Sequence, residues 1–370
     1  MRSRLISIFV ALYLITSLYS DEIKKNDVVF KFVPVVSSNP TAGTGFGVMG
    51  TMMYKTDEKS SPSQAIVAAQ YTNTDSYNIF VVNKLFFDND RWQSNTIYSH
   101  IFNNTSFSID VDFPISIPSD YMNPEFEVKI DAALQQVLYL VRKNIYIGGQ
   151  IFYISQDFKE KNSDGRVFLV TNGIESLSRG GFGLMLSYDT RDKDEKFYPT
   201  DSTLINLTIN DFPSFLGSDS PFYNIMLNAR KYIPLYFKDD VLAMQYFGQF
   251  CSEDTPDGAL AAFGARNILR GFPIGKYEAR YLNAVQFEYR YTIKNTKFRV
   301  APFVGYANLS GGSKGTNEQF NRDRDNGDYG SGGVGVHYIL SEQHQLDYRI
   351  DVAYSSDDEV SVYASINQAF

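Results

Sequence analysis

The sequence predicts an all-β protein, namely a 16-stranded antiparallel transmembrane β-barrel. Three observations lead to this prediction: an apolar N-terminal run behind a basic start, sixteen segments of alternating polarity, and a composition rich in aromatic residues. Alternation with a period of two places successive side chains on opposite faces, as in a strand. The two faces of each predicted strand therefore differ in polarity.

Residues 1–20 have the form of a secretory signal peptide. Arg2 and Arg4 precede an apolar run over 5–18, and small Ser20 stands just before acidic Asp21. The run is shorter than the roughly 20 residues that a spanning helix needs, which disfavours the alternative of a membrane anchor. We expect export with removal of residues 1–20, followed by a short periplasmic segment over 21–42.

Composition narrows the function classes. The 370 residues include 29 Phe and 26 Tyr but one Trp, and aromatic residues make up 15% of the chain, which suits a barrel with aromatic girdles. The single cysteine, Cys251, excludes an intrachain disulfide framework. A formal net charge of −8 disfavours nucleic acid as a partner.

The alternating segments define one barrel domain over residues 43–370. They lie at 43–55, 63–74, 76–87, 91–102, 105–115, 125–141, 144–157, 179–191, 201–211, 221–233, 238–250, 279–293, 297–308, 329–340, 344–355 and 359–370, and Pro114 interrupts the fifth. Short links at 74–75, 142–143, 294–295 and 341–343 are predicted at one end, and longer connections at 157–178, 212–220, 251–278 and 309–328 at the other. Barrels of the outer membrane have short periplasmic turns and longer outer loops.

The polar face of each strand is predicted to line a wet lumen. In 279–293, Val285 and Phe287 share one face, and Glu288 and Arg290 share the other. A charge that faced lipid at mid-depth would cost about 2–4 kcal/mol, so the charged face is expected inside. A soluble sheet protein would show the same alternation of polar and apolar residues along its strands. The signal peptide, the even strand count and the terminal Phe370 favour the membrane.

Three stretches resemble the Omp85 superfamily, whose barrels include outer-membrane protein insertases and two-partner secretion transporters. The first contains Asp189, Arg191 and Asp192 and continues into Phe-Tyr-Pro-Thr at 197–200. The second is Leu269-Arg270-Gly271-Phe272, with Glu-Tyr-Arg at 288–290 about one strand later. The third runs from the glycines at 332–335 to Phe370, which is predicted to be the C-terminal barrel signal.

The resemblance implies a role for the loop around Arg270, Gly271 and Phe272. In the family this loop folds back into the barrel, and its Arg meets an acidic and aromatic site on the inner wall. The family's partner strand often carries aromatic-x-Asp-x-Gly, but the stretch 303–307 reads Phe-Val-Gly-Tyr-Ala and lacks the acid. The predicted substitutes are lumen-facing acids: Glu288, Asp347 and Asp351.

The resemblance also implies a function that is not enzymatic. Segment 21–42 is too short for the polypeptide-transport-associated domains of the family's insertases. We therefore expect a stand-alone outer-membrane barrel that assists insertion or translocation of polypeptides, in contact with lipid, lipopolysaccharide and unfolded outer-membrane proteins. The alternative is a passive channel or a structural surface antigen without a client.

The sequence also predicts a weak seam between the first and last strands, and it predicts neither a cofactor site nor a metal site. The glycine-bearing first strand, 43–55, is expected to pair loosely with 359–370, because Gly weakens a strand. Gly45-x-Gly47-x-x-Gly50 matches a dinucleotide fingerprint, but alternation continues where that motif needs a helix. The histidines show no ligand spacing, so neither a cofactor nor a metal is predicted.

Overall fold

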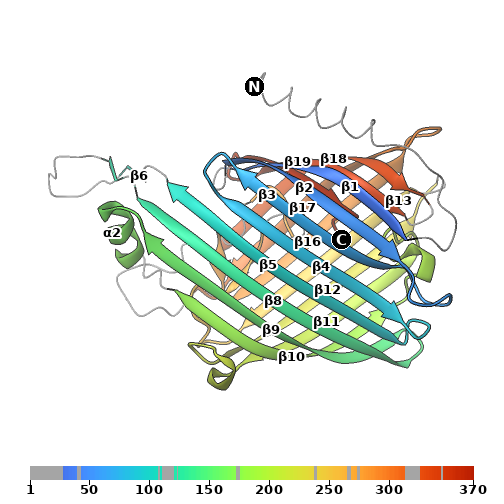
Figure 1. Ribbon diagram of the computed structural model, residues 1–370, viewed down its shortest axis with the longest axis horizontal. Coiled ribbons are helices and arrows are strands. Elements are labelled where there is room, and N and C mark those ends of the chain that lie inside the picture. The colour runs from blue at the N-terminus through green and yellow to red at the C-terminus, as the bar shows by residue number, and fades with distance from the viewer. Residues whose placement is uncertain are drawn as a thin grey trace.

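The computed structural model describes residues 28–39, 43–106, 109–110, 121–122, 124–171, 176–236, 240–264, 268–272, 276–312, 326–342 and 345–370. In this part of the chain, sixteen antiparallel strands form one barrel in sequence order (Figure 1). They are β1 (Val29–Asn39), β2 (Gly43–Tyr54), β3 (Ser63–Thr72), β4 (Tyr77–Phe87), β5 (Trp92–Ser106), β8 (Glu125–Arg142), β9 (Ile145–Glu160), β10 (Leu177–Asp189), β11 (Ser202–Phe212), β12 (Phe222–Pro234), β13 (Val241–Cys251), β16 (Tyr281–Thr292), β17 (Phe298–Ser310), β18 (Gly327–Ser341), β19 (Leu346–Ser355) and β20 (Val360–Ile366). The predicted fold class is confirmed.

Small elements occupy the connections between barrel strands. Strand β6 (Ile109–Asp110) pairs with β7 (Tyr121–Met122), and β14 (Ala261–Ala262) pairs with β15 (Glu278–Ala279). One α-helix, α2 (Ser163–Thr171), and two 3-10 turns, η1 (Lys193–Glu195) and η2 (Ser214–Leu216), are also described. Among the described helices, none has the length and apolar character needed to cross a membrane.

The sequence-based strand count is right, but one predicted strand is wrong and one barrel strand was missed. Segment 105–115 is not a separate barrel strand: its first two residues end β5 at Ser106, and its other described residues, Ile109–Asp110, form a strand in a separate small sheet. The missing strand is β1, which lies within the predicted periplasmic segment 21–42, so the barrel begins at Val29 instead of residue 43. Pro34 obscured β1, and Pro is tolerated in a strand at an edge. The predicted signal peptide, 1–20, lies outside the described residues.

Because one predicted strand was wrong and β1 was missed, the ends of the barrel were partly misassigned. Consecutive connections of an up-and-down barrel alternate between its ends, which places 107–124, 161–176, 252–280 and 311–326 at one end, here called the long-loop end. Connections 143–144, 293–297 and 342–345 lie at the other end, the short-turn end. The link at 74–75, predicted among the short turns, lies at the long-loop end.

The strand faces follow the predicted parity. In β16, Val285 and Phe287 are exposed on the outside, whereas Gln286, Glu288 and Arg290 are buried inside. The same alternation in β10 leaves Leu184 69% exposed. Outward aromatic and aliphatic residues therefore form the outer surface of the barrel, and the ionic residues lie in the lumen.

The seam between the first and last strands is the weakest part of the wall. Among the described residues, β1 and β20 share a single register pair, Ser38 opposite Val362. By contrast, β1 pairs with β2 along its whole length, from Val29 opposite Met53 to Asn39 opposite Gly43. The glycine-bearing strand β2 is thus one strand away from the seam, and the predicted seam strand 43–55 is corrected to β1.

Beyond that pair the wall overlaps itself. Tyr348 shares the outer face of β19 with exposed Val352 and Tyr354, yet it is only 1% exposed. It packs in one cluster with Val29 and Val33, which occupy the inner face of β1, and its hydroxyl donates to the carbonyl of Pro34 at 2.8 Å. The short-turn ends of β19 and β20 therefore lie inside β1 and β2.

Candidate functional site

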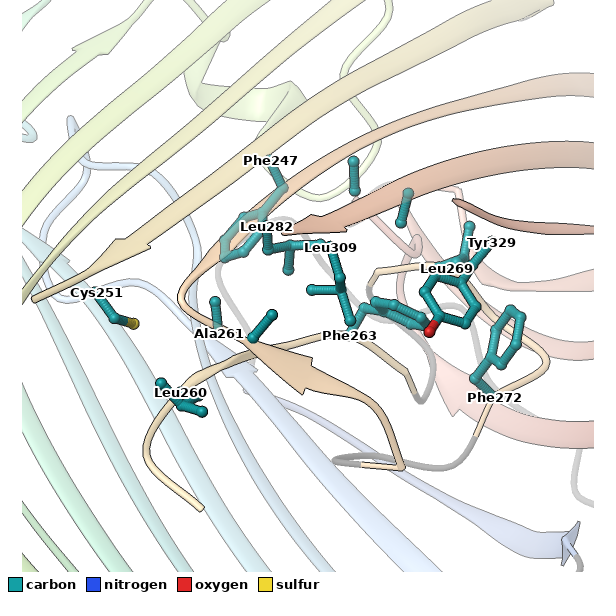
Figure 2. Packing of buried hydrophobic residues seen from close by; sticks show 13 residues of the cluster. Phe247, Cys251, Leu260, Ala261, Phe263, Leu269, Phe272, Leu282, Leu309 and Tyr329 are labelled. Carbon is teal, nitrogen blue, oxygen red and sulfur yellow. The ribbon is translucent and has the colours of Figure 1, made fainter. Parts of the chain in front are cut away.

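Connection 252–280 folds into the lumen and is held there by apolar packing. Its residues Leu260, Phe263, Leu269 and Phe272 are buried against inward side chains of the wall, including Phe247, Leu282, Leu309 and Tyr329 (Figure 2). The Phe263 ring lies 5.0 Å from that of Tyr329, and the Phe272 ring lies 6.0 Å from it. Fully burying one such side chain stabilises a fold by about 1.5–3 kcal/mol.

Arg270 lies at the centre of this packing and is bound to two carboxylates. Its Nη2 is 2.8 Å from Oε2 of Glu288, and its Nη1 is 3.0 Å from Oδ2 of Asp351. The guanidinium lies over the Phe303 ring, 3.4 Å from its centroid. All three charged side chains are at most 1% exposed, so each charge depends on its partners for stabilisation.

Of the three acids predicted to meet Arg270, the structure brings two to it. Asp347 instead pairs with Arg299 and accepts from the side-chain amide of Gln368 at 2.6 Å. Asp347 and Asp351 lie four residues apart in β19, which separates them by roughly 13 Å along the strand. Arg270 therefore reaches only the acid nearer the long-loop end.

The backbone around Arg270 is shaped by two unusual conformations. Leu269 has φ 52° and Gly271 has φ 112°, in the left-handed region that glycine tolerates best. The Leu269 amide donates to Oε1 of Gln286 at 2.9 Å. The Gly271 amide donates to the Tyr363 hydroxyl at 3.1 Å, and Ser361 donates to the Gly271 carbonyl at 3.3 Å. The loop tip is thus attached to β20, the strand at the seam.

Packing explains why the family's acid is missing from β17. The pattern Phe303-x-Gly305 keeps the aromatic residue under Arg270 but has glycine where the acid is expected. A Cβ at Gly305 would lie 2.9 Å from Cδ1 of Leu269. Leu269 therefore occupies the space of that side chain, and β16 and β19 supply the acids.

The predicted strand-turn motif forms a second ionic cluster, at the short-turn end. Arg191 binds both carboxylate oxygens of Asp189, at 2.9 and 3.0 Å, and Lys196 reaches Asp189 at 2.8 Å. Asp192 begins η1 and makes no side-chain cap there. The ion pairs shape connection 190–201 so that Phe197 and Tyr198 are buried.

Phe370 lies inside the barrel, not at the end of the last strand. Strand β20 ends at Ile366, so the predicted strand 359–370 is too long. The Phe370 side chain is 4% exposed and packs with Tyr198 and Tyr232. Its main-chain oxygen accepts from Nη2 of Arg290 at 2.7 Å.

Arg299 and several contacts of the predicted lumen residues escaped the sequence analysis. Glu288 accepts from Arg290 at 2.9 Å as well as contacting Arg270, so one acid links the loop tip to the region around Phe370. Arg299 lies 4.0 Å from the Tyr198 ring centroid. Alternation had placed Arg290 in the lumen but could not show which side chains it meets there.

Comparison of the sequence with family models decides the classification. Residues 63–370 match the Omp85 superfamily domain. The chain belongs to the Omp85 superfamily. The match reaches further toward the N-terminus than the three motifs, and it confirms the resemblance seen in the sequence. A search of curated proteins gives no match.

Solved Omp85 structures have the same barrel fold. BamA from Haemophilus ducreyi lacking POTRA domains 1–3 is 13% identical with a TM-score of 0.54, and the match covers 93% of this chain and 70% of that one. CdiB from Escherichia coli is 11% identical with a TM-score of 0.64, covering 94% and 63%. CdiB from Acinetobacter baumannii is 10% identical with a TM-score of 0.57, covering 92% and 59%. The chain thus spans less than two thirds of either CdiB, and these identities show the fold alone.

Proposed function

We propose that this Omp85 barrel assists the insertion or translocation of polypeptides at the bacterial outer membrane, and that clients pair with it at the seam. The observation that carries the proposal is the single register pair between β1 and β20. A strand edge presents unpaired backbone groups that can template an incoming strand. Opening this edge breaks few hydrogen bonds, each with a net contribution of about 0.5–1.5 kcal/mol.

The overlap keeps the seam shut at rest. Val29, Val33, Leu346, Tyr348 and Ile366 are buried between the overlapping strands. An incoming strand offers the same backbone pairing to β1, so it compensates for the hydrogen bonds that are lost. The apolar overlap then sets the barrier to opening.

The Arg270 loop serves this function by closing the lumen. Its apolar side chains and its two ion pairs fix the loop to β16, β18 and β19, and its tip contacts β20. We place the long-loop end outside the cell, because outer-membrane barrels carry their longer loops there. The outward apolar belt would then contact outer-membrane lipid and lipopolysaccharide.

A covalent lock across the seam tests the proposal. The pair Ser38→Cys and Val362→Cys, in a Cys251→Ala background, joins the opposed residues of β1 and β20. The matched control, Ala69→Cys with Ile79→Cys, locks β3 to β4, which are already fully paired. In cells that depend on the variant, we expect oxidation of the seam pair to deplete other barrels from the outer membrane, with recovery on reduction.

The outcome separates two classes of function. The control lock should leave the outer-membrane proteome unchanged. An unchanged proteome with a fully oxidised seam would contradict the insertion role and leave the passive channel or structural surface antigen.

A further inference from the structure

The last four residues cross the lumen at the short-turn end. After β20 the Asn367 amide donates to the carbonyl of Asp347 at 2.9 Å, and its side chain donates to Gln64 of β3 at 2.7 Å. Gln368 donates to the carboxylate of Asp347 at 2.6 Å. Segment 367–370 therefore begins beside β19 and β3 and ends at β12, β13 and β16, which Phe370 contacts.

The pocket that receives Phe370 is built from four separate elements. Its members are Tyr198 of connection 190–201, Tyr232 of β12, Val241 and Ala243 of β13, and Arg290 of β16. Arg290 lies 5.6, 5.7 and 5.9 Å from the ring centroids of Tyr198, Tyr232 and Phe370. A cation beside aromatic rings attracts a further ring and leaves its N–H groups free to bind a main-chain oxygen.

Two side chains that the tail contacts, Arg290 and Asp347, have partners of their own. Arg290 is oriented by Glu288 at 2.9 Å, and Asp347 is held by Arg299, so the polar contacts of Gln368 and Phe370 lead to side chains that other partners also hold. The tail itself continues from a seven-residue strand whose other edge is the single-pair seam. Of the two partners, the tail is therefore the one that is able to leave.

We propose that this pocket is a binding site for a polypeptide segment that carries an aromatic residue, and that residues 367–370 are its resident occupant. This inference rests on the proposed function, because it makes the chain's own tail a competitor of the client. The ligand's ring enters between Tyr198 and Tyr232, its main-chain oxygen binds Arg290, and a carboxamide two residues earlier binds Asp347. Displacement of the tail also removes the contact between Asn367 and Gln64, which couples occupancy of the pocket to release of the seam.

Peptide binding to the purified full chain in lipid nanodiscs tests the site. The probe is a fluorescent peptide with the sequence of residues 365–370, and the matched probe ends in Ala instead of Phe. We expect Phe370→Ala to bind the Phe-ended probe at least tenfold more tightly than the wild type, because its own tail fills the pocket poorly. Phe370→Ala should bind the Ala-ended probe at least tenfold more weakly than it binds the Phe-ended probe.

Two further variants complete the design. Tyr236→Ala removes an aromatic side chain from the same end of the barrel, but Tyr236 is 99% exposed, so this variant should bind like the wild type. If Phe370→Ala fails to fold, judged by heat-modifiable migration on gels, Gln368→Ala replaces it. That variant weakens the tail through Asp347 and should tighten probe binding about threefold.

Equal binding by the wild type and the tail variants, or equal binding of the two probes, would overturn the site. These results are independent of the cellular assay. If the probe binds but the seam lock leaves the proteome unchanged, the proposed pocket stands and the proposed insertion role is wrong. If the probe does not bind but the seam lock depletes other barrels, only the proposed pocket is wrong.

Discussion

Glu288 contacts two arginines at once and so connects the lumen loop to the pocket at the short-turn end. One of its oxygens binds Arg270 and the other binds Arg290. Removing one member of a buried ionic group leaves an uncompensated charge, which costs about 3–5 kcal/mol. The ionic residues of the lumen therefore behave as one network rather than as separate pairs.

Replacing Arg270 should both destabilise the barrel and open it. Arg270→Ala leaves Glu288 with one arginine and deprives Asp351 of its 3.0 Å contact, so the loop loses its ionic attachment. We expect raised ion conductance in planar bilayers and a free energy of unfolding lower by about 3 kcal/mol. Arg91→Ala, at an exposed turn, is the control. Unchanged conductance would show that the loop does not close the lumen.

Restoring the family's acid on β17 should be harmful here. Gly305→Asp forces its Cβ against Leu269, and overpacking of this kind costs about 1–3 kcal/mol. Urea unfolding in lipid vesicles should show that loss, and a second change, Leu269→Ala, should recover part of it. Gly330→Ala is the control, since its Cβ meets nothing within 4 Å. A stability gain in Gly305→Asp would mean that the acid reaches Arg270 without moving Leu269.

The sequence identified part of the site, for reasons that are visible in the residues. Period-two alternation placed Glu288, Asp347 and Asp351 in the lumen, and the Arg-Gly-Phe motif identified the loop tip. Alternation predicts which face of a strand a side chain occupies but not how far along the barrel axis it lies. It therefore could not show that Asp351, and not Asp347, is within reach of Arg270. It also gives no information across the lumen, which is why the neighbours of Arg290 and the position of Phe370 were missed.

At the scale of elements, connection 252–280 is attached at several points outside the ionic network. Lys276 contacts Asp357 at 2.6 Å and Glu359 at 2.9 Å, both on the connection between β19 and β20. Partial burial opposes the charge, but the hydrogen bonds to these two acids raise the pKa of Lys276 above its ordinary value. The loop is thus attached to the connection that leads into seam strand β20 as well as to β20 itself.

The pH dependence of that attachment follows from the sign of the shift. A lysine whose pKa is raised on folding stabilises the fold below its ordinary pKa of about 10.4 and loses this effect as pH rises through the folded value. Lys276→Met should therefore lower stability by up to about 1 kcal/mol at pH 7 to 9, with the difference from wild type shrinking above pH 10. Unfolding midpoints across this range measure it. A difference that grows with alkaline pH would contradict the assignment.

Strand β1 shows how an element escapes detection. Pro34 interrupts its alternation, and its position before the glycine-rich strand β2 made it look like a leader to the barrel. An edge strand that forms one register pair on its free side can accommodate a proline, because few of its amides must donate there. Pro34, which hides β1 in the sequence, is thus tolerated because β1 is the edge strand at the seam.

At the scale of the whole molecule, the overlap is the property that pattern reasoning could not supply. Parity assigned Leu346 and Tyr348 to lipid with the rest of the outer face of β19, but both are covered by β1 and β2. The outward residues Val352 and Tyr354 on the same strand follow the prediction. Only tertiary contacts distinguish these two pairs, because their sequence pattern is the same.

A pair of alanine substitutions tests the overlap directly. Tyr348→Ala empties a protein-filled space and breaks the bond to the Pro34 carbonyl, so it should cost about 3–5 kcal/mol. Tyr354→Ala removes a ring that is 52% exposed on the same face and should cost under 1 kcal/mol. Unfolding in lipid vesicles provides both values. Equal losses would indicate an ordinary edge-to-edge closure.

A barrel whose first and last strands overlap also has an adjustable diameter. In a barrel with complete edge pairing, strand number and stagger fix the diameter. Here the short-turn ends of β19 and β20 lie inside β1 and β2, so these strands can slide apart by a small distance, and the barrel can widen, before its lumen is exposed to the bilayer. Expansion and leakage thereby become separate events.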